Sequence, residues 1–487
     1  MLILRFLLRL IGPIVFVMFQ LLEPPASLGD EGFTLIGITL WMAIWWITEA
    51  VPIAVTALLP IVLFPLFEVI PLSETTQQYG HKYVFLYIGG FILAIAIERW
   101  NLHKRIALQI IKWIGSKAPY LILGFMLATA FLSMWISNTA TTVMMLPIAI
   151  AITHQVQSQH NQDKQQSDLF SKSLMLSIAY SASIGGIATL IGTPPNLIFA
   201  GVLENTYGIK IGFFEWMKFG FPVSMLLLFI SWKYLTRFTF KLKQVHFNEG
   251  KKEVKAMLNQ LGKLSYEEKA VGVVFLLAAL SWVFRSVIAT VIVGIDDTII
   301  AISAAVLLFL IPTKQKDRQL LTWNEAVKIP WGIIILFGGG MALAKAFVET
   351  GLANWIASQI SLFEGVSIFL LVVLVSALVN FLTEVTSNLA TTAMLLPILA
   401  PLALSFDVHP YILMIAVTLS ASCAFMLPVA TPPNAIVFGA NYLKISDMVK
   451  KGFLLNLISI FVISLAVYLL MPFVFELDSL SFPEVFK

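Results

Sequence analysis

The chain has 487 residues, of which 59% are hydrophobic and 12% are charged, and its formal net charge is +4. Soluble domains carry about twice that share of charged residues, so the composition excludes an ordinary soluble protein and predicts an all-α polytopic membrane protein in the lipid bilayer. The small positive charge sits in loops between spans and gives no reason to expect nucleic acid as a partner. The single cysteine, Cys423, excludes an intrachain disulfide.

Residues 1–30 predict a retained N-terminal helix and its connection. Arg5 and Arg9 precede an apolar stretch, as in a secretory signal, but Arg9 and Pro13 interrupt that stretch and no good cleavage site follows. Two spans over residues 33–67 are expected to meet at a turn near Glu49, and another span covers residues 84–97. Basic and apolar residues alternate at helical spacing over residues 99–114, which predicts a helix lying along the membrane interface.

A polar motif appears once in each half of the chain. Residues 137–147 (SNTATTVMMLP) return 250 positions later as residues 387–397 (SNLATTAMLLP), with differences at three positions. Each copy lies in the middle of an apolar stretch that is too long for one span. Because irregular backbone at membrane depth must be buried in protein or line a cavity, each stretch predicts a re-entrant helical hairpin, over residues 119–152 and 366–404.

A second motif follows each hairpin, as GTPPN at residues 192–196 and ATPPN at residues 430–434. Two adjacent prolines remove two backbone donors, so a broken helix is expected over residues 174–206 and 411–443. A hairpin and a broken helix in each half predict two repeats, residues 31–236 and 270–476, with about 11 transmembrane helices in all.

Lys and Arg placement predicts the orientation in the cell membrane. Basic residues gather near the N-terminus, in residues 99–117 and in the polar linker 237–269, whereas acidic residues dominate the opposite loops. By the positive-inside rule the N-terminus and the linker are cytoplasmic, and residues 477–487 form an extracellular tail. An odd number of crossings per repeat makes the two repeats inverted.

Together the Ser-Asn tips, the Thr-Pro-Pro-Asn breaks and residues 422–437 (SCAFMLPVATPPNAIV) resemble the divalent anion:sodium symporter family of di- and tricarboxylate transporters. The resemblance implies an elevator-type carrier, with a static scaffold and a moving transport domain, that works as a homodimer. It implies a C4-dicarboxylate such as succinate, malate or fumarate as substrate, sodium ions as coupling ions and no other cofactor.

Charge balance agrees with sodium coupling. Each hairpin tip places a helix N-terminus, worth about half a positive charge, near the midplane. Two tips leave a dianion about one unit short, and bound sodium ions are the simplest source of the rest. The resemblance implies sodium ligands at Ser133, Ser137, Asn138, Gly192, Thr383, Thr386, Asn388 and Ala430. It implies substrate contacts from Ser137, Asn138, Thr139, Thr193, Ser387, Asn388, Thr431 and Pro432. Leu389 departs from the family pattern, in which many members have Thr.

Two alternatives remain at this point. A sodium-independent dicarboxylate exchanger would replace sodium with a protein cation, and Lys345, which lies inside a predicted span with Glu349 four residues on, is the candidate. A membrane enzyme or a channel is the other alternative. The chain contains neither an HExxH nor a GxSxG motif, and no catalytic residue is predicted.

Overall fold

A computed structural model describes residues 2–115, 117–159, 164–242, 248–315, 317–359, 367–477 and 479–483, and the regular secondary structure of these residues is helical throughout. The helices of the first half are α1 (Leu2–Gln20), α2 (Asp30–Thr48), α3 (Ile53–Thr56), α4 (Leu59–Leu66), α5 (Leu72–Tyr79), α6 (Lys82–Arg99), α7 (Leu102–Ile114), α8 (Ala118–Ser133), α9 (Asn138–Gln159), α10 (Lys164–Gly186), α11 (Pro194–Tyr207), α12 (Phe213–Lys233) and the π-helical turn η1 (Tyr234–Thr239).

The remaining helices are α13 (Asn248–Gln260), α14 (Tyr266–Val283), α15 (Arg285–Ile288), α16 (Asp297–Leu310), α17 (Trp323–Ala326), α18 (Trp331–Glu349), α19 (Leu352–Gln359), α20 (Ile368–Leu382), α21 (Asn388–Ser405), α22 (Pro410–Ala421), α23 (Pro432–Gly439), α24 (Ile445–Leu465), the π-helical turn η3 (Ala466–Leu470) and α25 (Met471–Val474). Seven segments of the described chain are long and apolar enough to cross a membrane, and six shorter apolar helices accompany them. The chain is therefore a polytopic membrane protein.

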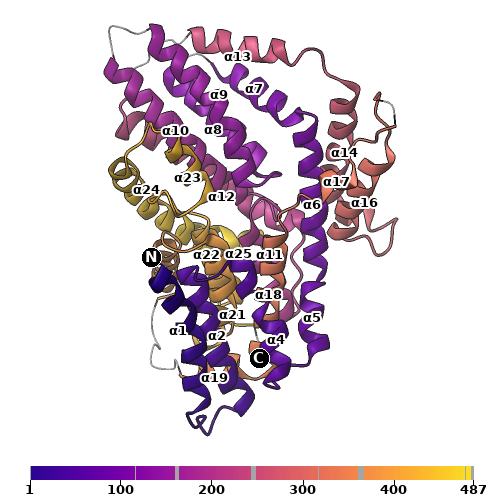
Figure 1. Cartoon of the computed structure of the whole chain (residues 1–487), viewed down its shortest axis with the longest axis vertical. Coiled ribbons are helices and arrows are strands. Elements are labelled where there is room, and N and C mark those ends of the chain that lie inside the picture. The colour runs from indigo at the N-terminus through magenta and orange to yellow at the C-terminus, as the bar shows by residue number, and fades with distance from the viewer. Residues whose placement is uncertain are drawn as a thin grey trace.

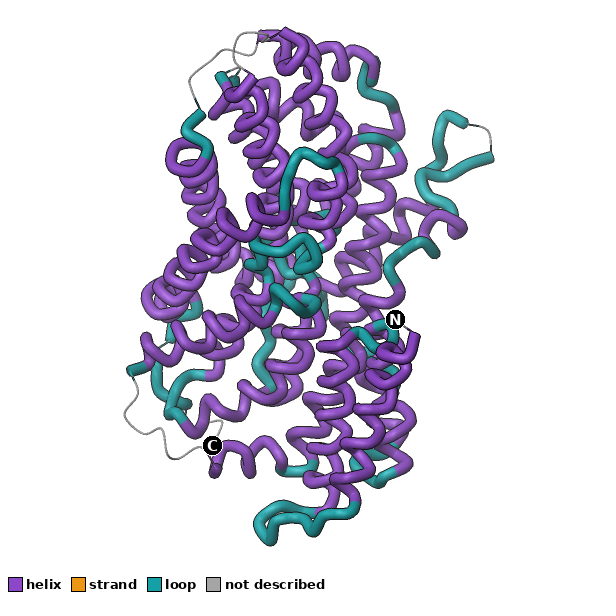
Figure 2. The backbone as a smooth tube through the Cα atoms, turned by 60° about the vertical axis from the view of Figure 1, so that its left-hand side comes forward, coloured by secondary structure: helices purple, strands orange, loops and turns teal. Residues whose placement is uncertain are grey.

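The predicted hairpins and broken helices are present in both halves. In the hairpins, α8 turns into α9 just before Asn138, and α20 turns into α21 just before Asn388. In the broken helices, α10 gives way to α11 at Pro194, and α22 gives way to α23 at Pro432. In Figure 1 the first hairpin extends from the centre toward the upper end, while α21 of the second lies below the centre, so the halves are inverted. Figure 2 shows a group of loops in the middle of the helical mass.

Two polar stretches that the sequence predicts as loops, residues 155–171 and the linker 237–269, are largely helical where they are described. The helix α10 begins at Lys164, ten residues before the predicted start of the broken helix, and α13 occupies much of the linker. The first stretch is rich in Gln and the linker is rich in Lys and Glu; all three are good helix formers with side chains that water solvates. Their polarity was the basis for predicting loops, but a helix outside the membrane needs no apolar surroundings. Residues 160–163 and 243–247 of these stretches lie outside the described residues.

The turn near Glu49 lies where the sequence places it. The helix α2 ends at Thr48, and Glu49 takes a left-handed backbone conformation with φ 46°. The second predicted span of this region is divided into the short helices α3 and α4. The Gly-Gly spans α6 and α18 pack closely on their neighbours: a Cβ at Gly89 would lie 2.7 Å from Ala301, and a Cβ at Gly339 would lie 2.5 Å from the Ala57 carbonyl oxygen.

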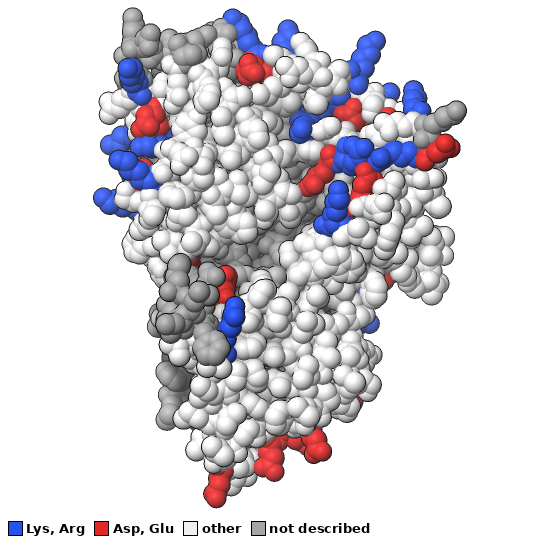
Figure 3. All heavy atoms as spheres, viewed as in Figure 1, with Lys and Arg blue, Asp and Glu red and all other residues white. Residues whose placement is uncertain are grey.

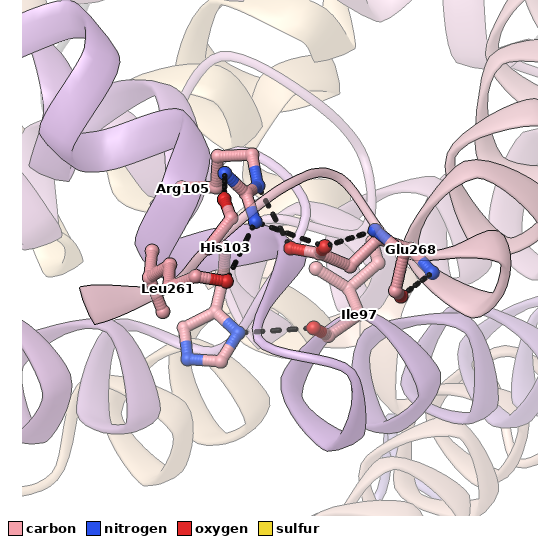
Figure 4. Close-up of polar contacts among 7 residues, drawn as sticks. Ile97, His103, Arg105, Leu261 and Glu268 are labelled. Atoms are coloured by element: carbon pink, nitrogen blue, oxygen red, sulfur yellow. Dashed lines mark hydrogen bonds and ion pairs between the residues drawn. The ribbon is translucent and has the colours of Figure 1, made fainter. Parts of the chain in front are cut away.

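The amphipathic arm α7 connects α6 to the first hairpin, and Arg105 fixes it to the segment between α13 and α14 (Figure 4). The guanidinium donates to both Glu268 oxygens at 2.9 and 3.0 Å and to the carbonyls of Leu261 and Gly262 at 3.3 and 3.1 Å. His103 on the same arm lies 2.9 Å from the Ile97 carbonyl. Burial lowers the pKa of His103 to about 4, so the ring is neutral near pH 7 and donates through Nδ1.

Charged side chains are distributed unevenly along the long axis (Figure 3). Lys and Arg gather on the upper part, over the ends of α7, α9 and α13, whereas only Asp and Glu are visible at the lowest part. On the basic part, Arg99 and Arg318 both bind Glu325 at 2.6 Å. Burial alone would raise the pKa of Glu325, but hydrogen bonds from Arg318, Thr322 and Arg99 outweigh it and hold that pKa at about 2.

Candidate functional site

The first hairpin tip gathers oxygen atoms around a single hydroxyl. Ser133 is the last residue of α8 and is fully buried. Its Oγ lies 2.5 Å from Asn138 Oδ1 and 2.6 Å from the Ala182 carbonyl oxygen. One hydroxyl proton serves only one of these two acceptors, so the three oxygens together have spare lone pairs. Such a group is suited to an alkali cation, because hard cations take oxygen ligands.

The Gly192 carbonyl belongs to the same cluster. Gly186, the last residue of α10, lies between the break and the hairpin tip, and a Cβ there would lie 2.7 Å from Asn138 Oδ1 and 3.1 Å from the Gly192 carbonyl oxygen. Glycine at position 186 therefore allows the Asn138 amide and the Gly192 carbonyl to approach one another. Ser133, Asn138 and Gly192, three of the predicted ligands, come together here.

The second hairpin repeats this arrangement. Thr383 Oγ1 lies 2.8 Å from Asn388 Oδ1 and 3.1 Å from the Ala421 carbonyl oxygen, again with one proton for two acceptors. Thr386, also a predicted sodium ligand, has other partners. Its hydroxyl donates to the Leu382 carbonyl at 2.9 Å and lies 2.5 Å from Thr391 Oγ1. Its side chain still lines the cavity described next, as does Ala430.

A cavity of about 710 Å³ lies between the two tips. All the predicted substrate contacts line it, together with Leu389; they are Ser137, Asn138, Thr139, Thr193, Ser387, Asn388, Thr431 and Pro432. Thr139 is exposed to this space, whereas its counterpart Leu389 is buried. Residues from α2 and α6, among them Glu49, Tyr87 and Phe91, complete the wall. The two repeats thus contribute to one site.

Four helices of the hairpins and breaks begin at the cavity wall, in addition to the four-residue helix α3, whose first residue Ile53 also lines it. The four are α9, α11, α21 and α23, and their N-terminal residues Asn138, Pro194, Asn388 and Pro432 all line the cavity. The Ser137 and Ser387 hydroxyls accept hydrogen bonds from the backbone of Ala140 and Ala390 at 3.2 and 3.5 Å. Each N-terminus is worth about half a positive charge, so these four supply about two positive units. The two hairpin tips considered from the sequence supply only about one. Helix C-termini, which favour cations, lie instead at Ser133 and Thr383.

No lysine, arginine or histidine of the described chain lines this cavity, and Glu49 is its one charged lining residue. Glu49 makes no ion pair or hydrogen bond through its side chain with the described residues. Lys345 does not reach the cavity. It is half-buried and pairs with Glu349 one helical turn away.

The roles of three groups around the site were not predicted from the sequence. Asn196 and Asn434, the last residues of the two Thr-Pro-Pro-Asn motifs, are fully buried and donate to carbonyls inside each break. Glu384, which is 3% exposed, accepts from the backbone of Phe425 and Leu427 at 2.8 and 2.9 Å, and also from Met426 and Asn456. The repetition of Asn in both motifs was visible, but its partners depend on tertiary packing.

Comparison with known proteins gives a consistent result. The sodium:sulfate symporter transmembrane region matches residues 4–476. The sodium-dependent dicarboxylate transporter SdcS of Staphylococcus saprophyticus is 47% identical over 476 residues, covering 96% of this chain and 92% of that protein. The protein of the same name in Staphylococcus aureus USA300 is 46% identical over the same length.

Two solved structures share the fold at low identity. The YdaH transporter of Alcanivorax borkumensis aligns with a TM-score of 0.57 at 13% identity, over 82% of this chain and 87% of its own. MtrF of Neisseria gonorrhoeae, described with a class of antimetabolite efflux pumps, aligns with a TM-score of 0.55 at 13% identity, over 82% of this chain and 84% of its own. At this identity the likeness concerns the fold alone.

Proposed function

The chain belongs to the divalent anion:sodium symporter family, and we propose that it carries a C4-dicarboxylate of the succinate, malate or fumarate class across the cell membrane together with sodium ions. Two relatives at 46–47% identity over nearly the whole chain are named as sodium-dependent dicarboxylate transporters. The observation that carries the proposal is the cavity between the two Ser-Asn tips, with helix N-termini around it and an oxygen cluster behind each tip.

The charges around the cavity support coupling to a cation. Four helix N-termini supply about two positive units, which offset the two charges of a dicarboxylate. Glu49 adds a negative charge to the wall, so the loaded cavity is about one unit negative until cations bind. The oxygen clusters at Ser133 and Thr383 are suitable places for these cations, with Asn138 and Asn388 shared between cation and substrate.

The sodium-independent exchanger has less support. Such an exchanger needs a protein cation at the substrate, and none of the described residues that line the cavity is basic. Lys345, the candidate for that role, is paired with Glu349 outside the cavity. A transporter without this cation depends on a bound ion to hold a dianion in a low-dielectric site.

We also propose how the carrier moves and sits in the membrane. The hairpins and broken helices form the transport domain, and α6, α16 and α18 belong to the scaffold, where Gly89 meets Ala301. Transport proceeds by an elevator-type displacement of one domain against the other, in a homodimer with a cytoplasmic N-terminus and an extracellular C-terminus. The basic upper part in Figure 3 is then the cytoplasmic side.

Uptake by proteoliposomes tests the function. Purified protein is reconstituted into vesicles, and labelled succinate uptake is measured with an inward sodium gradient, with potassium in its place, and with or without internal succinate. We expect uptake into empty vesicles that requires sodium. Uptake that ignores sodium and requires internal dicarboxylate would instead establish an exchanger. Vesicles without protein and vesicles with the Asn388→Ala variant are the controls for leak and for site-dependent transport.

A further inference from the structure

One tyrosine in the cavity wall has an unused hydroxyl. Tyr87 lies on α6, and although its side chain lines the cavity, the residue is only 3% exposed. Its hydroxyl forms no hydrogen bond with any residue in the described part of the chain, yet it is not among the fully enclosed polar atoms without a partner. The space open to it is therefore the cavity itself.

Three of the four other buried tyrosines in the described chain, Tyr83, Tyr180 and Tyr234, are satisfied by backbone. The hydroxyl of Tyr83, one turn earlier on α6, donates to the Ile211 carbonyl at 3.3 Å. Those of Tyr180 and Tyr234 donate to the carbonyls of Phe425 and Lys451, both at 2.9 Å. A buried tyrosine normally finds a partner because an unpaired hydroxyl is costly. Tyr87 and Tyr411 lack such a bond among the described residues, but only Tyr87 of the two lines the cavity. Its position beside the tips indicates that its acceptor arrives with the ligand.

The Tyr87 ring is held in place by neighbouring side chains on α6. Tyr87 and Phe91 lie one turn apart, with ring centroids 4.3 Å apart, and both line the cavity. Gly90 on the same face packs on Ile191 in the first break, where a Cβ would lie 3.4 Å from the Ile191 Cδ1. This face of α6 thus lies directly against the first broken helix, next to the residues that hold the first tip.

The second repeat offers no equivalent hydroxyl. The 250-residue offset pairs Tyr87 with Phe337, whose ring packs toward Gly201 on α11 and does not line the cavity. The same offset pairs Thr139, exposed in the cavity, with the apolar Leu389. Both differences place hydroxyl groups on the side of the first repeat, so the two ends of a bound molecule meet different surroundings.

We propose that the Tyr87 hydroxyl donates a hydrogen bond to one carboxylate of the transported dicarboxylate, on the side of Thr139, and that Tyr87 is a specificity-determining residue supplied from outside the two hairpins. The proposal rests on the proposed function and adds to it the position of one carboxylate. A carboxylate is a strong acceptor for a phenol O–H donor, because a hydrogen bond to a charged group is stronger than one between neutral groups.

The Tyr87→Phe variant tests this, since it removes the hydroxyl and keeps the ring. A hydrogen bond to a charged group is worth about 1.5–3 kcal/mol, which corresponds to a ten-fold to hundred-fold change in affinity. We expect the KM for succinate at saturating sodium to rise at least about ten-fold, with the half-saturating sodium concentration little changed. Tyr83→Phe is the matched control, because it removes a hydroxyl from the same helix that is bonded to Ile211.

A second measurement is independent of the transport rate. Succinate-induced stabilisation of the detergent-purified protein against heating, in saturating sodium, should require correspondingly more succinate in Tyr87→Phe than in wild type or Tyr83→Phe. Equal succinate dependence in Tyr87→Phe and wild type, in both assays, overturns the assignment of Tyr87 while the proposed function stands. Wild-type protein that neither takes up nor binds succinate overturns the proposed function itself.

Discussion

At each hairpin tip, one hydroxyl faces two acceptor oxygens, and this shortage of protons is the basis for the two cation sites that we propose. Asn138 and Asn388 are central to it, because the Oδ1 atom of each lies beside the hydroxyl while the residue also lines the cavity. The Thr142 and Thr392 hydroxyls each donate to the backbone carbonyl of the asparagine four residues earlier, at 2.8 Å. One amide therefore connects the cation cluster to the substrate cavity.

Replacing either asparagine should stop transport. Asn138→Ala and Asn388→Ala each remove one proposed cation ligand and one cavity donor. We expect sodium-driven succinate uptake to fall at least about 100-fold, since each contact to a charged group is worth about 1.5–3 kcal/mol and two are lost together. The measurement is uptake by proteoliposomes containing equal amounts of protein. Asn205→Ala is the control, because this asparagine bonds to Gln78 away from the cavity. Wild-type rates in either tip variant would refute the proposed site.

Leu389 should set which anions fit. It is buried at the position where the first repeat has the exposed Thr139, so Leu389→Thr adds a hydroxyl donor and removes apolar bulk in the wall. We expect the ratio of KM values for a tricarboxylate and for succinate to fall several-fold. Leu395→Met, which also makes the second copy of the motif match the first but does not line the cavity, is the control. An unchanged ratio would show that this wall does not contact the substrate.

At the scale of residues, repetition made the site predictable. The two Ser-Asn tips and the two Thr-Pro-Pro-Asn motifs were visible as copies, and the structure brings them to one cavity. Tyr87 and Glu49 have no copy and lie far from the motifs in sequence, and only the packing of α2 and α6 beside the tips shows them. Lys345 was a candidate because of its hydropathy context, but a partner four residues away neutralises it.

At the scale of elements, one asparagine side chain donates hydrogen bonds to the freed carbonyls of each break. The Asn196 amide donates to the carbonyls of Gly186, Ile187 and Thr189 at 3.1, 3.3 and 2.7 Å. In the second break the Asn434 amide donates to the carbonyls of Ala424 and Leu427 at 3.1 and 3.0 Å. Adjacent prolines interrupt the helix, and these amides satisfy carbonyls that the interruption frees in a region without water.

Loss of these amides should loosen the breaks and weaken sodium binding. In Asn434→Ala the carbonyls of Ala424 and Leu427 lose their donor, at a cost of about 1–3 kcal/mol for each unpaired buried group. We expect a lower melting temperature of the purified protein and a several-fold higher half-saturating sodium concentration, because Ala430 lies in the same break. Asn259→Ala on α13 is the control. A lower melting temperature with unchanged sodium dependence would separate the break from the cation site.

The sequence predicted elements well inside the membrane and less well outside it. Apolar length and paired prolines place α8, α9, α11 and α23 closely, because lipid permits few backbone conformations. Outside the membrane, polarity does not distinguish a solvated helix from a loop, and so α13 and the start of α10 were missed. Arg105 shows why α13 matters: it fixes the arm of the first hairpin to the segment that follows this helix.

At the scale of the whole molecule, the charge distribution gives the orientation a physical basis. Basic side chains gather on the upper part of the protein, together with some acidic ones, and only acidic ones are visible at the lowest part (Figure 3). Lys and Arg are retained on the cytoplasmic side during insertion, and the anionic inner leaflet further favours them there. In a carrier with inverted repeats, the two tips approach the cavity from opposite sides. The cavity can then be reached in turn from either side of the membrane.

The orientation is testable because the chain has one cysteine and that cysteine is buried. In a Cys423→Ala background, we expect Ala26→Cys, in the exposed turn between α1 and α2, to react with a membrane-impermeant maleimide on intact cells. We expect Gln315→Cys, in the exposed loop after α16, to react only after the cells are permeabilised. Both positions are exposed in the fold, so a difference between them reports the side of the membrane and not burial. The loops that contain the two positions belong to opposite halves and carry opposite charge. The reverse labelling pattern would therefore contradict the positive-inside assignment. Labelling of both positions on intact cells would contradict a single fixed orientation.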